Sequence, residues 1–182
     1  MKKVITFLTI LALVVCASCN EKLKNPIEKT ATVDLGGQWY VIYNCLDAEG
    51  KVIPDFEDFN EGYSMVITFS TSSNTKDSIW VSDTKEKNLL GYQVKVPCNL
   101  DNLTFGADQE LPNIYGPSKY IGPKAIVKNG KILKGAAKTP SGMPADSIYF
   151  ELKLSDDYFA NGYGYDSYQV TGYRYTGFAA DE

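Results

Sequence analysis

The sequence predicts an all-β protein, an antiparallel up-and-down barrel of about eight strands. Short runs rich in Val, Ile, Tyr, Phe and Thr follow one another after residue 38, and turn residues separate them. Several runs alternate apolar and polar side chains, as strands with one buried face do. Beyond the first residues, no segment of useful length repeats its apolar residues with the period of a helix.

The first residues are typical of a bacterial lipoprotein signal peptide, residues 1–18. Lys2 and Lys3 precede an apolar stretch that is too short to span a bilayer. Ser18 places a small side chain directly before Cys19, as processing requires for a thiol that carries lipid. We therefore expect lipidation at Cys19 and attachment to a membrane through acyl chains. An ordinary cleaved signal peptide is the alternative.

Residues 19–34 are predicted to form a flexible tether, because they are charged and polar with little apolar periodicity. The barrel domain is expected over residues 35–182, a length that suits one domain. We expect the protein in the cell envelope, lipid-anchored at the outer membrane. Whether it faces the periplasm or the cell surface stays open.

Nine runs are the predicted strands of the barrel. Their bounds are 39–46, 63–71, 78–82, 90–96, 103–105, 125–128, 131–134, 147–154 and 168–178. Asn129 and Gly130 separate two of them and are expected to form a hairpin turn, because both residue types adopt positive φ. The predominance of hairpins between neighbours favours a barrel over a sandwich.

Alternation within two strands predicts which side chains line the barrel. In each strand the apolar side chains of every second residue share one face. The predicted wall residues of a ligand cavity are Met65, Ile67 and Phe69 in one strand and Ile148, Phe150 and Leu152 in the other. A register error of one residue would turn such a set to the opposite face.

Two long loops carry aromatic side chains and are candidates for a lid or a binding surface. The first, residues 107–123, contains Tyr115 and Tyr120, which we expect to cover the cavity. The second, residues 155–167, contains four aromatic residues beside aspartates. Such rings stack on sugars or cap an apolar cavity.

The composition excludes several function classes. There is no histidine, so Ser-His-Asp and Cys-His catalysis and histidine-ligated zinc or haem are excluded. A net charge of −4 and a single arginine argue against nucleic acid as a partner. The acidic loop around Phe56 and Phe59 lacks the spacing of an EF-hand, and we expect its rings to fold onto the barrel rim. We expect no catalytic motif, no metal site and no cofactor.

Cys45 and Cys98 are the cysteines of the barrel domain. Export to an oxidising compartment permits a disulfide between them. Each could equally be a small buried side chain, because each adjoins a predicted strand.

Four stretches together resemble a family of small bacterial lipoproteins labelled "lipid-binding putative hydrolase". They are residues 34–41, 74–81, 101–105 and 172–178. The resemblance covers nearly the whole domain after the tether. It implies a lipocalin-like barrel and an apolar ligand, and it supplies no catalytic motif.

Gly37, Trp39 and Arg174 match the way in which lipocalin-like proteins close the base of the barrel. There the first strand begins with Gly-x-Trp, and a basic residue of the last strand crosses the indole. A guanidinium over an indole face gains about 0.5 to 2 kcal/mol. We interpret these three residues as structural. The alternative is that Arg174 binds an anionic group of a ligand.

Three functions fit the sequence. The first is an envelope protein that binds a small apolar or amphipathic, lipid-like ligand inside the barrel. The second is a surface module that binds carbohydrate or a partner protein through its tyrosine-rich loops. The third is a hydrolase that uses two facing carboxylates. Inward rings at Phe69, Tyr92, Phe150 and Tyr173 would favour the second function, because they would leave no cavity.

Overall fold

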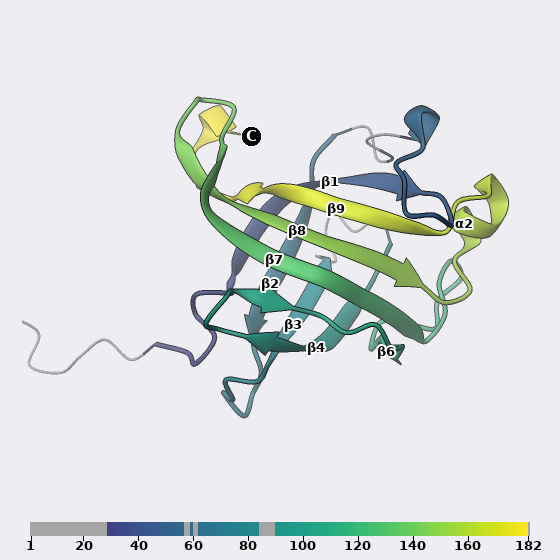
Figure 1. Ribbon diagram of the computed structural model, residues 1–182, viewed down its shortest axis with the longest axis horizontal. Coiled ribbons are helices and arrows are strands. Elements are labelled where there is room, and N and C mark those ends of the chain that lie inside the picture. The colour runs from purple at the N-terminus through teal and green to yellow at the C-terminus, as the bar shows by residue number, and fades with distance from the viewer. Residues whose placement is uncertain (1–28, 57–58, 60–61, 84–89, 182) are drawn as a thin grey trace, which may run out of the picture.

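A computed structural model describes residues 29–181 apart from 57–58, 60–61 and 84–89. The predicted signal peptide, the predicted lipidation site Cys19 and most of the predicted tether lie outside the described residues. The described residues form an antiparallel β-barrel, as the sequence predicts (Figure 1). No helix in this part of the chain is long and apolar enough to cross a membrane.

Eight strands close the barrel, and a short additional strand, β6, pairs with β7. In chain order the elements are β1 (Gly37–Leu46), η1 (Pro54–Phe56), β2 (Ser64–Ser70), β3 (Ser78–Asp83), β4 (Gln93–Asn99), β5 (Thr104–Phe105), β6 (Leu111–Pro112), β7 (Lys124–Lys138), β8 (Pro144–Leu154), α2 (Tyr158–Tyr163), β9 (Ser167–Arg174) and η2 (Ala179–Asp181). Neighbours along the chain pair from β1 to β5 and from β7 to β9. The pairs β5 with β7 and β9 with β1 complete the closure.

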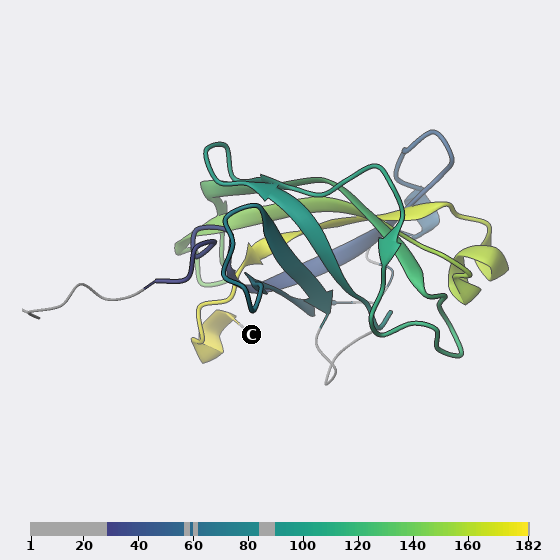
Figure 2. The ribbon, with the colours of Figure 1, turned by 90° about the horizontal axis from the view of Figure 1, so that it is seen from below.

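The two ends of the barrel differ. At one end, which we call the base, β1 begins and β9 ends. At the other end, the mouth, η1 and α2 lie beyond the last residues of β1 and β8 (Figure 1). Figure 2 shows the same arrangement from a second direction, with α2 at the mouth and η2 at the base.

The interior of the barrel is filled by large side chains. The largest are Trp39, Tyr43, Tyr92, Phe150 and Tyr168, each with an exposed fraction of 1% or less. They belong to one core cluster of buried residues. Burial of this apolar surface is the main stabilising contribution to the fold. Because strands alternate, the residues between these point to the outer wall.

The hairpin predicted at Asn129 and Gly130 is wrong. The runs 125–128 and 131–134 belong to one strand, β7, whose register with β8 shifts between Lys128 and Lys131. Asn129 does have a positive φ, 56°, but it lies in a β-bulge and not in a hairpin turn. The chain does not reverse there, because β8 pairs with β7 on both sides of the bulge.

The helix α2 is an element that the sequence patterns did not predict. Asp157 caps it, and its Oδ1 accepts hydrogen bonds from the backbone N–H groups of Phe159 at 2.9 Å and Ala160 at 3.1 Å. Gly164 ends it with a φ of 81°. Six residues are too few for helical periodicity to show in the sequence.

Candidate functional site

The base of the barrel is closed by hydrogen bonds as well as by packing. The guanidinium carbon of Arg174 lies 4.3 Å from the centroid of the Trp39 ring, the contact that the sequence predicts. Arg174 Nη1 donates to the carbonyl oxygen of Gly36 at 2.8 Å, and Trp39 Nε1 donates to Thr68 Oγ1 at 2.9 Å. A Cβ on Gly37 would lie 2.3 Å from Arg174 Nη1, so only glycine leaves room for this arrangement. Arg174 therefore contacts the Gly36 carbonyl and the Trp39 ring, which are groups of the protein itself.

The last residues of the predicted tether add to this closure. Residues 31–35 form turns, and Thr32 and Leu35 are fully buried. Thr32 Oγ1 is hydrogen bonded to Ser70 Oγ, with 2.6 Å between the oxygens. The folded part of the chain therefore begins earlier than residue 35.

Three of the predicted wall residues line the interior. Ile148, Phe150 and Leu152 of β8 are fully buried and belong to the core cluster. The ring of Phe150 packs against Phe105 of β5, with 5.9 Å between centroids. The alternation in β8 was sufficient to predict its inward face, because the opposite face carries Glu151 and other polar residues.

The other three predicted wall residues point to the outside, so this part of the prediction is wrong. They are Met65, Ile67 and Phe69 of β2. Val66 is fully buried opposite the inward Trp39, whereas Phe69 is 37% exposed. The physical reason is space. The Trp39 indole fills the interior opposite β2, so the smaller Val66 and Thr68 pack there.

Four rings were expected to distinguish a hollow barrel from a filled one, and two of them point inward while two point outward. Tyr92 and Phe150 point inward, and both are fully buried. Phe69 stacks on Trp80 on the outer wall. Tyr173 contacts Tyr63, also outside. Other rings of the core take up the interior space instead.

The mouth is covered by aromatic side chains from three segments of the chain. We call this set the aromatic cover, and its members are Phe56, Phe59, Tyr120, Tyr158, Phe159, Tyr163 and Tyr165. Rings of different segments lie with centroids 5.6 to 6.2 Å apart. Phe56 and Phe59 fold onto the rim, as predicted.

The two predicted lid residues lie in the loop between β6 and β7. Tyr120 belongs to the aromatic cover and is 40% exposed. Tyr115 is half-buried in the same loop, where its backbone N–H donates to Asn113 Oδ1 at 3.2 Å.

A column of rings leads from the aromatic cover into the barrel. Tyr163 is 60% exposed and contacts Phe56, which contacts Tyr165. The Tyr165 ring lies 5.2 Å from the Tyr168 ring, between centroids, and Tyr168 lies 6.0 Å from Tyr43. Tyr168 is fully buried. The column therefore runs without a break from solvent to the core.

Polar atoms accompany this column. Tyr165 Oη and Tyr168 Oη are 2.7 Å apart, and Tyr168 Oη donates to Asp157 Oδ2 at 2.8 Å. Deeper in the barrel, Tyr43 Oη and Tyr92 Oη are 3.0 Å apart. Burial raises the pKa of Tyr43 and of Tyr92, so both hydroxyls stay protonated. The column offers hydroxyl groups within an apolar surface.

Asp83 is a buried carboxylate at the mouth end of β3. It accepts backbone hydrogen bonds from Gly91 at 2.6 Å and Tyr92 at 2.8 Å, and so joins β3 to the start of β4. Burial raises its pKa to about 6, although these bonds act in the opposite direction.

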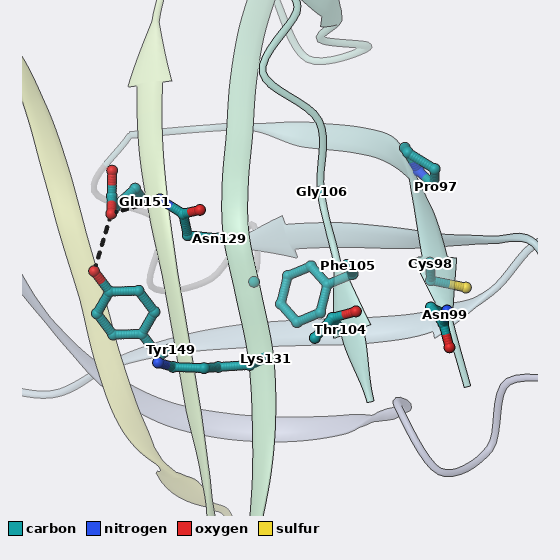
Figure 3. Close-up of a pocket in the computed structure, with 11 residues that line it drawn as sticks. Pro97, Cys98, Asn99, Thr104, Phe105, Gly106, Asn129, Lys131, Tyr149 and Glu151 are labelled. Atoms are coloured by element: carbon teal, nitrogen blue, oxygen red, sulfur yellow. Dashed lines mark hydrogen bonds between the residues drawn. The ribbon is translucent and has the colours of Figure 1, made fainter. Parts of the chain in front are cut away.

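A hollow of about 770 Å³ lies on the outer wall where β5 meets β7, and it is open to solvent (Figure 3). Glu151 forms part of its lining and accepts hydrogen bonds from Tyr149 Oη at 3.0 Å and Asn129 Nδ2 at 2.9 Å. Lys131 lies over the Tyr149 ring, 4.8 Å from its centroid. The lining combines these polar groups with Pro97 and Phe105. Among the described residues, no group of three His, Cys, Asp or Glu side chains is placed to hold a metal ion.

The two cysteines of the barrel are free thiols in this structure. Cys45 lies near the mouth end of β1, and Cys98 lies near the base end of β4. The length of the barrel separates them.

The sequence matches the family model "Lipid-binding putative hydrolase" over residues 24–179. The chain belongs to this family. The resemblance found in the four sequence stretches is thereby confirmed. A search of curated proteins finds no match. The family's lipid-binding description and the closed barrel together fit a barrel that binds lipid.

Sequence reasoning missed the buried end of the ring column. Tyr43 and Tyr168 were not singled out, although Trp39, Tyr43 and Cys45 alternate in the first strand. That alternation could have identified their face. Asp157 gave a recognisable signal as well, because an aspartate directly before a short aromatic run is a helix cap.

Proposed function

We propose that this chain is a lipid-anchored envelope protein that binds a small apolar or amphipathic, lipid-like ligand at the mouth of its barrel. The observation that carries this proposal is the ring column from Tyr163 through Tyr165 and Tyr168 to Tyr43. It joins a partly exposed apolar surface to the core. The lipid-binding description of the family supports the same ligand class.

The mouth is the end at which a ligand enters. The base is held by the hydrogen bonds of Arg174 and Trp39. In the aromatic cover, the segments meet mainly through ring contacts, each worth about 0.5 to 1.5 kcal/mol. Such rings change rotamer without breaking the strand pairing of the barrel. Because the interior is filled, an alkyl chain takes the place of cover rings rather than an empty cavity.

The polar atoms beside the column bind the other end of an amphipathic ligand. The hydroxyls of Tyr165 and Tyr168 and the Asp157 carboxylate already bond to one another there. A few fixed polar groups in an apolar surface are typical of sites for such molecules.

Native mass spectrometry tests the proposal. The soluble form, residues 21–182, retains every described contact and is purified without detergent, and then oleate is added. We expect a lipid-sized mass that is lost on denaturation, or binding of oleate at one molecule per chain. The variant Phe59→Ala is expected to change oleate binding, while Phe178→Ala, exposed and outside the cover, leaves it unchanged. If the protein shows only the mass of its own chain, and added oleate does not increase that mass, the proposal is overturned.

Recognition of carbohydrate or of a partner protein is the second candidate function. It is supported by the filled interior and by the exposure of Tyr158 and Tyr163, 61% and 60%. Tyrosines held this way offer ring faces and hydroxyls to a ligand outside the barrel. This function becomes the better account if the purified protein carries no lipid-sized mass and does not bind oleate.

A further inference from the structure

The outer wall of the barrel has two different sides. On β7 and β8 it carries ion pairs such as Lys128 with Glu151, 3.4 Å apart, and Lys134 with Asp146, 3.1 Å apart. On β1, β2, β3 and β9 it carries mainly aromatic and apolar side chains. We call this second set the apolar wall, and its members are Tyr40, Tyr63, Met65, Ile67, Phe69, Trp80, Tyr173 and Tyr175.

Four tyrosines form one part of the apolar wall. The Tyr40 ring lies 6.1 Å from Tyr63, 5.9 Å from Tyr173 and 4.9 Å from Tyr175, between centroids. Met65 is the register partner of Tyr40 on β2 and continues the surface. Tyr63 is 53% exposed, whereas Tyr40 and Tyr173 lie beneath it with exposed fractions of 6% and 5%.

Phe69 and Trp80 form the other part, nearer to the base. Their rings stack with 6.4 Å between centroids and 21° between planes. Phe69 is 37% exposed, and Trp80 is half-buried. The exposed and half-buried members of the wall, from Tyr63 through Met65 and Ile67 to Phe69 and Trp80, form an apolar surface of the kind that marks an interaction face.

The chain toward Cys19 leaves the barrel beside this pair. Thr32 is bonded to Ser70, the residue after Phe69, and the backbone N–H of Ala31 donates to Asn74 Oδ1 at 2.7 Å. About ten residues connect Cys19 to Lys29, and they span at most about 36 Å. A link of this length keeps the Phe69 side of the barrel close to a membrane that holds Cys19.

The chemistry of the apolar wall suits the interfacial layer of a bilayer. Tyr and Trp combine an apolar ring with a polar atom and gather at that depth. Lys95 is the exposed register partner of Trp80, so a lysine stands on the neighbouring strand beside the apolar wall. A lysine at the edge of an apolar surface reaches lipid phosphates while its stem stays on that surface.

We propose that the apolar wall lies against the lipid bilayer that carries the Cys19 anchor, with Phe69 and Trp80 in its interfacial layer. This inference rests on the proposed acylation at Cys19. It goes beyond the proposed ligand site, because it concerns the outer wall and not the mouth.

The two tryptophans of the protein make this inference testable by fluorescence. Trp39 is fully buried at the base, and Trp80 is on the apolar wall. The acylated full-length protein is placed in phosphatidylcholine vesicles with bromine atoms in the upper part of the acyl chains. We expect Trp80 to lose about half of its emission relative to vesicles without bromine. In Trp80→Phe the remaining emission of Trp39 should not change between the two vesicles.

Two matched substitutions complete the test. Phe69→Ser should reduce the quenching of Trp80, whereas Leu133→Ser, on β7 and somewhat more exposed at 45%, should not. Equal thermal unfolding temperatures of the variants show that both keep the fold. Vesicle-attached protein whose Trp80 is not quenched would overturn the inference and leave the anchor intact. Protein that does not float with vesicles and lacks the acyl mass would overturn both. A solution dimer lost in Phe69→Ser would assign the wall to a second copy and also overturn it.

Discussion

Arg174 shows at the scale of one residue how the base of the barrel is held. Its Nε pairs with Asp146 Oδ2 at 3.2 Å, Nη1 donates to Gly36, and its plane covers Trp39. The lysine at position 134 pairs with the same carboxylate but is about half exposed. Two cations on one aspartate therefore allow a matched comparison.

We expect Arg174→Met to lower the free energy of unfolding by about 2 kcal/mol, because it removes the cation–π contact and leaves a carbonyl without its donor. Lys134→Met should cost less than about 0.5 kcal/mol, since an exposed ion pair contributes little. Urea unfolding of both variants measures this. Equal losses would show that Arg174 acts only as a charge beside Asp146.

Asp83 makes stability depend on pH through burial. Its pKa is about 6 in the folded protein against an ordinary value of 3.8. Between these values the folded state binds a proton more tightly than the unfolded chain does. The contribution of Asp83 to the free energy of unfolding therefore decreases as pH rises from about 4 to 6, and is constant outside that window.

The comparison of wild type with Asp83→Asn isolates this effect. We expect the free energy of unfolding of wild type, minus that of the variant, to be larger at pH 4 than at pH 7. Urea unfolding across this pH range measures the difference. Asp101→Asn, an exposed aspartate, serves as the control. A difference that stays constant between pH 4 and 7 would contradict the assignment.

At the scale of elements, the seam between β5 and β7 depends on Gly130. The β-bulge lays this residue against Phe105, and a Cβ on it would lie 2.4 Å from the Phe105 ring and 2.5 Å from its carbonyl oxygen. β5 has only two residues, so it has little pairing with which to absorb a displacement. The closure of the barrel is therefore most sensitive at this point.

We expect Gly130→Ala to destabilise the protein by about 2 kcal/mol, as overpacking of a core does. Gly162→Ala in α2 is the control, because nothing lies within 4 Å of the added carbon and alanine favours a helix. Denaturant unfolding curves of the two variants provide the measurement. A neutral Gly130→Ala would mean that β5 shifts freely on β7.

At the scale of the whole molecule, the two ends of the barrel should open to different extents. Cys45 lies beneath the aromatic cover, in contact with Tyr165, and burial raises its pKa to about 12. Cys98, on the other side of the barrel, is partly exposed. Residues 21–182 contain only these two cysteines, so Cys45 reports on the mouth and Cys98 serves as the reference.

We expect Cys98 to react with a thiol reagent before Cys45 in the soluble form, residues 21–182. Phe59→Ala should raise the reaction rate of Cys45 by about tenfold, because it removes a ring that packs on both Tyr165 and Tyr168. The rate of Cys98 should stay the same. If both rates rise together, the variant has loosened the whole barrel and not the mouth.

The sequence by itself determined the fold class, most strands and the closure of the base. The fold class and the strands depend on local alternation, so they can be predicted from residues near in sequence. Trp39 and Arg174 are far apart in the chain, and their contact was expected from the resemblance to lipocalin-like proteins. The faces of β8 were also predictable, since Glu151 and Lys153 cannot both be buried without partners.

Only the tertiary structure decided the rest. β2 has apolar side chains on both faces, and the Trp39 ring from β1 left room for Val66 and not for Phe69. Asn129 and Gly130 suit a hairpin as well as a bulge, and the strands on either side made the choice. The aromatic cover joins segments about 100 residues apart. Its packing depends on contacts between distant residues, which no local pattern in the chain contains.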